Sequence, residues 1–255
     1  MLTFWGHLDV FRKSMFRIVA IVAAITIVVF CSKDWIWTVL FAPSNGNFIT
    51  YRLIENVMHS MGVEGFRFKD CSVDLITTEL SSQFMQHIKT SIYLGLLGGS
   101  PYILFELFRF VSPALYENER RYSVQISIVI YVLFLIGVLM TYYVLFPISF
   151  RFLGTYSVSE RIQGAVTLDS YISTFITLTL LVGLVFQLPV ISFILAKMGI
   201  ISSKVLSKYR KHSLLIISFV AAVITPPDLL TLVLVILPLY FLYEVSIWIT
   251  RCVRA

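Results

Sequence analysis

Three polar side chains fall inside long apolar stretches of the sequence, where an uncompensated polar group is costly. Glu106 and Glu244 are carboxylates, and Gln187 is an amide in the middle of its stretch. A charge at the centre of a bilayer costs roughly 2.5–3.5 kcal/mol on insertion scales. Because Arg109 and Arg251 follow the two acids within about two helical turns, both can be locally paired interfacial residues or functional groups. The amide of Gln187 needs a hydrogen-bond partner in the protein or in a wet groove.

The residue types that carry enzyme chemistry do not form a recognisable site. The sequence contains no HExxH, GxSxG or GxGD motif. Its four histidines lie in separate segments, and its three cysteines lack a metal-ligand spacing such as CxxC. We therefore expect no metal, no cofactor and no enzymatic activity.

The composition shows which elements must position these polar groups. Of the 255 residues, 58% are hydrophobic and only 13% are charged. A soluble domain carries roughly 45–50% apolar and about 25% charged residues. This excess of apolar surface excludes a soluble enzyme, a nucleic-acid-binding domain and a disordered chain. We predict an all-α polytopic membrane protein, and no nucleic acid among its partners.

Charge-free stretches locate the membrane spans, since a spanning helix needs about 20 apolar residues. The Thr225-Pro226-Pro227-Asp228 turn ends one helix before the next begins, so the last two spans form a tight hairpin. Both are expected to be short. We predict six spans at residues 14–32, 88–110, 122–147, 170–196, 212–226 and 229–250, with outer loops at 33–87, 148–169 and 227–228.

The distribution of charge predicts the orientation of these spans. With the N-terminus inside, the inner segments hold 13 basic residues and three acids, Asp9, Glu117 and Glu119. The outer segments hold seven basic and nine acidic residues. Basic residues accumulate in cytoplasmic loops, so both termini are expected inside and the net charge of +6 is a topology signal.

Several short segments together resemble the TatC family, the receptor subunit of the twin-arginine protein translocase. Phe4–Arg12 resembles the family's HLxELR opening, Phe41–Pro43 its first outer loop, and Phe110–Arg121 its FxxPxLYxxERR inner loop. Gly137, Tyr142, Tyr143 and Pro147 resemble its third span, Phe186–Pro189 its F-[EQ]-x-P motif, Thr225–Asp228 its TPxD turn, and Tyr243-Glu244 its sixth-span acid. The resemblance covers essentially the whole chain.

The resemblance implies a cupped six-helix bundle that acts as a receptor. TatC proteins bind signal peptides bearing two adjacent arginines at the cytoplasmic face. They assemble with TatA-type and TatB-type single-span subunits and export folded proteins by using the proton-motive force. The implied location is the cell inner (cytoplasmic) membrane, among membrane lipids and with homo-oligomers expected.

The resemblance also implies which side chains bind the signal peptide. Carboxylates accept bidentate hydrogen bonds from guanidinium groups, and Glu119 stands at the acidic position of the family's inner loop. Val10 stands where the family's opening motif has an acid, so Asp9 or Glu117 is expected to replace it. Arg12 and Phe110 belong to the same two motifs and complete the expected site.

Polar residues of the last hairpin, Thr225, Asp228 and Thr231, are expected to meet a polar residue of a partner helix. Asp228 can also serve as the N-cap of the sixth helix. The family's prolines are expected to have structural roles, because proline removes a helix hydrogen bond and bends or ends the helix. Their counterparts here are Pro43, Pro113, Pro147 and Pro189.

Two other functions compete with this interpretation. A small proton-coupled secondary transporter would show inverted repeats and several midplane charges, and an intramembrane protease or lipid enzyme would show paired catalytic groups at one depth. The sequence has no internal repeat, and its only midplane polar residue is Gln187.

Overall fold

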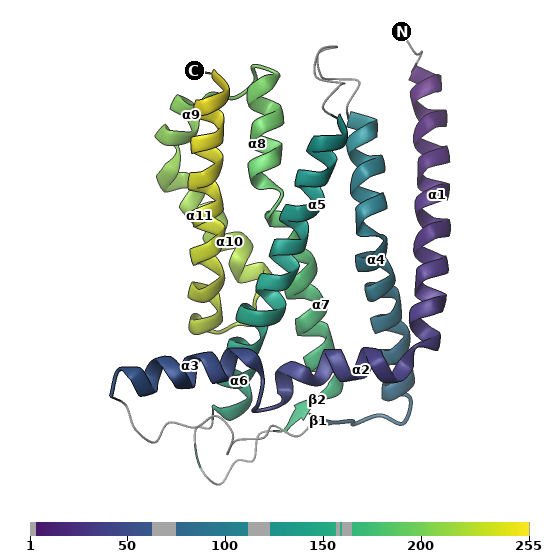
Figure 1. Cartoon of the computed structure of the whole chain (residues 1–255), viewed down its shortest axis with the longest axis vertical. Helices are drawn as coiled ribbons and strands as arrows, with labels where there is room; N and C mark the ends of the chain where they lie inside the picture. The colour runs from purple at the N-terminus through teal and green to yellow at the C-terminus, as the bar shows by residue number, and fades with distance from the viewer. Residues whose placement is uncertain (1–3, 63–74, 112–122, 157–158, 160–164, 255) are drawn as a thin grey trace.

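The computed structural model describes residues 4–62, 75–111, 123–156, 159 and 165–254. Helices dominate it (Figure 1). Those that run along the bundle are α1 (Phe4–Cys31), α4 (Ser82–Val111), α5 (Ser123–Met140), α6 (Phe146–Thr155), α7 (Leu168–Val185), α8 (Leu188–Lys197), α10 (Arg210–Ile224) and α11 (Leu229–Arg254). The other elements are α2 (Lys33–Phe41), the 3-10 turn η1 (Ala42–Ser44), α3 (Ile49–Ser60), α9 (Ser203–Lys208) and the strands β1 (Leu75–Ile76) and β2 (Val166–Thr167).

Five helical stretches of the described chain are long and apolar enough to cross a membrane. They are Phe11–Cys31, Ser82–Arg109, Ile126–Thr155, Leu168–Lys197 and Leu229–Cys252. The fifth predicted span corresponds to α10, which has only 15 residues. At ~1.5 Å per residue it is shorter than the ~30 Å apolar core of a bilayer.

The sixth predicted span is not short. Helix α11 has 26 residues and continues through Pro238 and past Glu244. The expectation of a short helix is wrong because the charge of Glu244 is balanced by Arg210, 2.8 Å away, so the helix does not have to end near it. The third predicted span is also longer than expected, since its helix continues to Thr155.

The long helices run side by side between two different ends (Figure 1). We call the end where α1 begins and α11 ends the terminal end. We call the opposite end, where α2 and α3 lie across the helix ends, the cap end. At the cap end β1 pairs with β2 in parallel, with Leu75 opposite Val166. The segment between α1 and α4 therefore covers the cap end with ordered helices.

The two apolar spans with an internal break both bend at a proline motif. Five residues in π-helical geometry, Thr141–Leu145, join α5 to α6 just before Pro147. A turn at Phe186 and Gln187 separates α7 from α8, and Pro189 stands at the start of α8. Proline lacks the N–H that would continue the preceding hydrogen bonds, so these breaks follow from the sequence.

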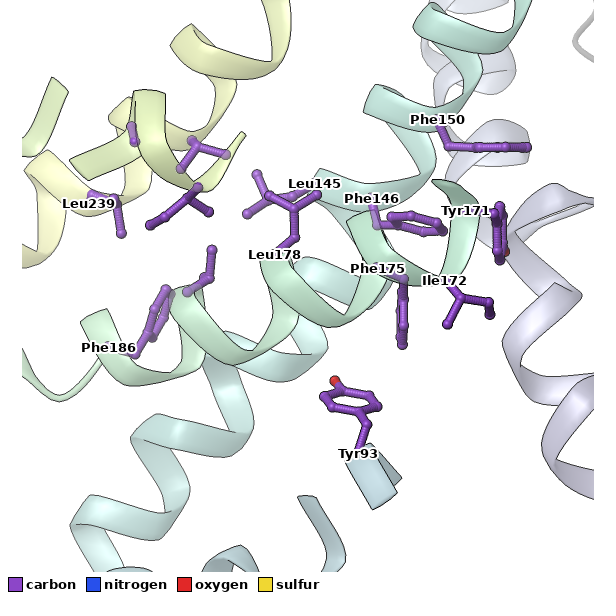
Figure 2. Packing of buried hydrophobic residues seen from close by; sticks show 14 of the residues in the cluster. Tyr93, Leu145, Phe146, Phe150, Tyr171, Ile172, Phe175, Leu178, Phe186 and Leu239 are labelled. Atoms are coloured by element: carbon purple, nitrogen blue, oxygen red, sulfur yellow. The ribbon is translucent and has the colours of Figure 1, made fainter. Parts of the chain in front are cut away.

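The main core runs along α7, from Tyr171 to Phe186, and includes residues of α6, α10 and α11 (Figure 2). The ring of Phe146 stands edge-on to those of Tyr171 and Phe175, each with centroids 5.0 Å apart. Edge-to-face pairs of this kind stabilise a core beyond the area that they bury. The buried hydroxyl of Tyr171 donates to the backbone oxygen of Leu40 at 2.7 Å, which joins α2 to this core.

Helix α1 packs mainly against α4, and their backbones approach closely at glycines of α4. A methyl group added at Gly95 would lie 2.0 Å from the Thr26 hydroxyl oxygen and 3.0 Å from the Thr26 Cα atom. Gly99, four residues further on, faces Val22 at 3.0 Å. Small residues at this spacing allow close packing of helices in membranes.

We predict that Gly95→Ala separates α1 from α4 and destabilises the protein by about 1–3 kcal/mol, as overpacking does. The thermal melting temperature in detergent measures this. Leu96→Ala, at a neighbouring position that is exposed on the same helix, is the matched control and should melt close to the parent. Equal melting temperatures for Gly95→Ala and the parent would contradict the close approach.

Candidate functional site

At the terminal end, the first turns of α1 carry an exposed ion pair. Arg12 Nη2 lies 3.0 Å from Asp9 Oδ1, and the two side chains are 65% and 55% exposed. Exposed pairs one turn apart contribute only about 0.3–0.5 kcal/mol. The carboxylate of Asp9 can therefore exchange Arg12 for another guanidinium at little cost.

Glu106, near the same end of α4, has the opposite environment. Its side chain is only 2% exposed, and it lies between α1 and α4. The Ser14 hydroxyl donates to Oε2 at 3.0 Å, while Arg17 Nη1 and the Tyr102 hydroxyl donate to Oε1 at 3.2 and 2.9 Å. Arg109 Nη1 lies 3.9 Å from Oε1. Arg17 and two hydroxyls donate to this carboxylate and Arg109 lies nearby, so cations of the protein itself balance its charge.

The remaining residues of the expected peptide site are only partly described. Pro113, Glu117 and Glu119 lie outside the described residues, between the end of α4 and the start of α5. Phe110 is in the last turn of α4, but its side chain is also outside the described part. Both α4 and α5 reach the terminal end (Figure 1), where Asp9 and Arg12 also lie.

Gln187 is buried at the break between α7 and α8. Its Nε2 donates to the backbone oxygen of Ile130 in α5 at 3.2 Å. Its Oε1 is buried and has no hydrogen-bond partner among the described residues. The amide therefore joins α5 to the α7–α8 break and keeps one acceptor unused.

An apolar groove opens beside this break, between α5, α8 and α11. Its volume is about 870 Å³, and every described residue that lines it is apolar. Ile126 and Ile249 line its part nearest the terminal end, and Phe186 and Met140 its deeper part. The groove begins near Ile126, close to the start of α5.

Glu244 joins α11 to the preceding helices. Arg210 Nη2 donates to its Oε2 at 2.8 Å, and the Tyr240 hydroxyl donates to its Oε1 at 3.2 Å. The Tyr243 hydroxyl donates to the backbone oxygen of Leu206 in α9 at 2.8 Å. The family's Tyr-Glu pair therefore has a structural role in positioning the last three helices.

The hairpin residues Thr225, Asp228 and Thr231 lie close together between α10 and α11. Asp228 caps α11, because its Oδ1 accepts from the Thr231 N–H at 2.7 Å. The Thr225 hydroxyl donates to the backbone oxygen of Ala221 at 2.9 Å. Asp228 Oδ2 and Thr231 Oγ1 are buried and have no hydrogen-bond partner among the described residues. The hairpin thus holds two polar atoms that another polar group could satisfy.

Two of the family's prolines meet at the cap end through Tyr51 of α3. The Tyr51 hydroxyl lies 2.9 Å from the backbone oxygen of Pro43 and 3.0 Å from that of Pro147, so its one proton is shared between them. Burial raises the pKa of this hydroxyl to about 12, although the nearby Arg151 guanidinium lowers it. Tyr51 stays protonated and joins α3 to the start of α6. Pro189, in contrast, lies at the break before α8.

Comparison with known proteins identifies the family of this chain. A family model described as Sec-independent protein translocase protein (TatC) matches residues 6–238.

The chain belongs to the TatC family. It is 33% identical over 250 residues to TatC of Blattabacterium sp. subsp. Periplaneta americana, which covers 97% of this chain and 94% of that protein. It is 34% identical over 177 residues to TatC of Escherichia coli K12, covering 69% and 68% of the two chains. A crystal structure of the twin arginine translocase receptor TatC matches with a TM-score of 0.76 and 26% identity, over 98% of this chain and 100% of that one.

Membership of the TatC family makes the chain a multi-pass membrane component of a protein translocase rather than an enzyme. This confirms the resemblance, the helical membrane class and the role in protein transport that the sequence predicted. Association with other components of the translocase follows from the same membership. Among the described residues, no group of three metal-ligating side chains could hold a metal ion.

The sequence indicated Arg109 as a partner of Glu106, and the structure has this pair at 3.9 Å, but the sequence analysis missed the other partners. Tyr102 stands four residues before it on the same helix, so helical spacing could have indicated this contact. Ser14 and Arg17 come from a different helix, and their contact depends on how α1 packs on α4. Arg210, which pairs with Glu244 from α10, escaped prediction for the same reason.

We predict that Arg17→Gln destabilises the protein far more than Arg12→Gln. The first change leaves the buried Glu106 carboxylate with only the more distant Arg109 as a cation. Because Arg17 itself is half exposed, we expect a loss below the about 3–5 kcal/mol of a fully buried pair. The second breaks an exposed pair worth less than about 1 kcal/mol. Melting temperatures of the two variants, on the same helix and with the same change of side chain, check this. Equal losses would contradict the assignment of Glu106 as a buried, structurally paired acid.

Proposed function

We propose that this chain is the signal-peptide receptor of a twin-arginine translocase, with six spans and both termini in the cytoplasm of a bacterial cell. In this orientation the terminal end lies at the cytoplasmic face of the inner membrane. The charge asymmetry of the sequence supports this orientation, and so does the position of the start of α1 and the end of α11 at the same end (Figure 1). Helix α10 is short for a span, and we propose that it crosses a locally thinned bilayer with the support of α11.

The availability of carboxylates at the terminal end is the observation that carries this proposal. Glu106 is buried and paired with the chain's own arginines, whereas Asp9 is exposed and weakly paired. Glu119 and Glu117 belong to the segment that joins α4 to α5 at the same end. We propose that Glu119, with Glu117 or Asp9, binds the two arginines of the peptide, and that Arg12 and Phe110 lie beside them. Arginine donates two parallel hydrogen bonds to one carboxylate, which lysine cannot do, so such a site discriminates arginine from lysine.

The apolar groove also supports the proposed binding of a signal peptide, because it can accept the apolar segment of the peptide. A secretory signal peptide carries a basic segment followed by about 7–15 apolar residues. The groove is lined by apolar residues only and starts near Ile126, at the beginning of α5. A peptide whose arginines are bound by the α4–α5 segment can therefore place its apolar residues in the groove and bury them from water.

Partner subunits have a separate candidate surface on α10. Leu215, Phe219 and Val223 form a stripe at every fourth residue and are exposed in this chain. We propose that TatA-type and TatB-type single-span helices pack here, close to Thr225, Asp228 and Thr231, and that the proton-motive force drives export by the assembly. The unused polar atoms of Asp228 and Thr231 could then receive a polar side chain of the partner. A proton-coupled transporter is not favoured by any feature of the described residues.

We predict that Glu119→Gln abolishes most binding of a twin-arginine peptide, because a neutral amide cannot pair with a guanidinium charge. Loss of one charge-assisted pair of about 1.5–3 kcal/mol corresponds to a roughly 10- to 100-fold weaker Kd. Fluorescence anisotropy of a labelled peptide with the purified protein in detergent measures this.

Two controls define this experiment. A twin-lysine version of the peptide should bind the parent protein as weakly as the twin-arginine peptide binds Glu119→Gln. Glu79→Gln removes an exposed acid before α4 at the opposite end and should leave the Kd unchanged. Unaltered binding by Glu119→Gln, or equal binding of both peptides, would contradict the proposed recognition.

A further inference from the structure

A second pocket, unrelated to the terminal end, lies at the cap end beside α2 and the start of α4 (Figure 1). Its volume is about 820 Å³, which falls in the usual range of small-molecule sites, about 300–1,000 Å³. Unlike the groove beside α8, it is lined by both polar and aromatic side chains. They include Lys33, Trp37, Asn45, Gln83, Phe84 and His87.

The polar side of this pocket has unused hydrogen-bonding and charge capacity. Lys33 makes no ion pair with a described residue, and Asp169, next to the lining residue Leu168, is paired with Lys89 at 3.0 Å. Asn45 and Gln83 are exposed, and their side-chain amides form no hydrogen bond within the described part of the chain. A ligand that enters here would therefore meet a free ammonium group and two free amides, which suit an anion.

His87 contributes its ring to the wall of the same pocket. The ring stacks on Phe30 with centroids 4.3 Å apart, and the ring of Trp37 lies 6.2 Å away. His87 and Trp37 both line the pocket and form an aromatic wall opposite its polar side chains.

The depth of the pocket indicates which anion would reach it. The apolar span of α1 ends at Cys31, two residues before Lys33, and that of α4 begins at Ser82, next to Gln83. The pocket therefore lies at the boundary between the apolar core and the headgroup layer, where lipid phosphates are found. Trp37 and the exposed rings of Trp35 and Phe84 suit the same layer, because aromatic side chains accumulate at membrane interfaces.

We propose that this pocket binds the headgroup of an anionic phospholipid at the cap end. The phosphate would lie between Lys33 and the amides of Asn45 and Gln83. The glycerol and the first acyl carbons would lie against Trp37 and Phe84. Such a lipid would attach α2 to the junction of α1 and α4 and so hold the cap in place.

The test uses the fluorescence of Trp37 in the full chain, with Trp5, Trp35 and Trp248 replaced by phenylalanine. The protein is placed in phosphatidylcholine vesicles that contain phosphatidylglycerol, and either lipid carries the bromine that quenches tryptophan. A lysine near a membrane surface contributes about 1 kcal/mol of attraction, or about fivefold in binding. We expect brominated phosphatidylglycerol to quench Trp37 with at least a fivefold preference over phosphatidylcholine.

Matched variants separate this site from general surface charge. Lys33→Gln should abolish the preference. Arg52→Gln, an exposed cation of α3 that does not line the pocket, should retain it. Equal quenching by both lipids in the parent, or equal losses in Lys33→Gln and Arg52→Gln, would overturn the proposal. Displacement of the quenching lipid by millimolar inorganic phosphate would also overturn it, in favour of a site for free anions.

Discussion

The buried carboxylate of Glu106 constrains the whole terminal end of this protein. An ionised side chain that is only 2% exposed must be paired, and its partners come from two helices. Ser14 and Arg17 of α1 meet Glu106 of α4, and further along the same helix pair Gly95 allows the two backbones to approach. Because α1 packs mainly against α4, these contacts fix where its first turns, and with them Asp9 and Arg12, lie.

The acidic residues of the chain therefore differ in whether they can pair with an external cation. Glu106 and Glu244 are held by arginines of neighbouring helices and position those helices. Asp9 is exposed and exchangeable, and the segment with Glu117 and Glu119 begins and ends at the same end of the bundle. A receptor for two adjacent arginines needs carboxylates that its own cations have not saturated. The proposed peptide site uses the acids that the fold leaves unused, and the apolar groove beside α8 begins close to them.

Local sequence signals predicted the class, the family and the main breaks of the fold. The Thr225–Asp228 turn and the break before Pro189 follow directly from proline chemistry. The sequence did not predict the helices α2 and α3, because short helices lack the length of a span. Their position depends on contacts such as that between Tyr171 and Leu40. The length of α11 was underestimated, because Arg210 neutralises Glu244 from a different helix. Pairings between helices, Arg17 with Glu106 above all, depend on packing that one sequence does not display.

Site-specific crosslinking tests the division of acids most directly. A twin-arginine peptide that carries a photoreactive residue beside its arginines is irradiated with the unchanged chain, and the crosslinked residues are located by mass spectrometry. We predict crosslinks to 119 and to 117 or 9, and none to 106, because Glu106 is buried between α1 and α4. A strong crosslink to 106 together with none to 117 and 119 would show that the peptide enters between these helices, and would contradict the proposed site.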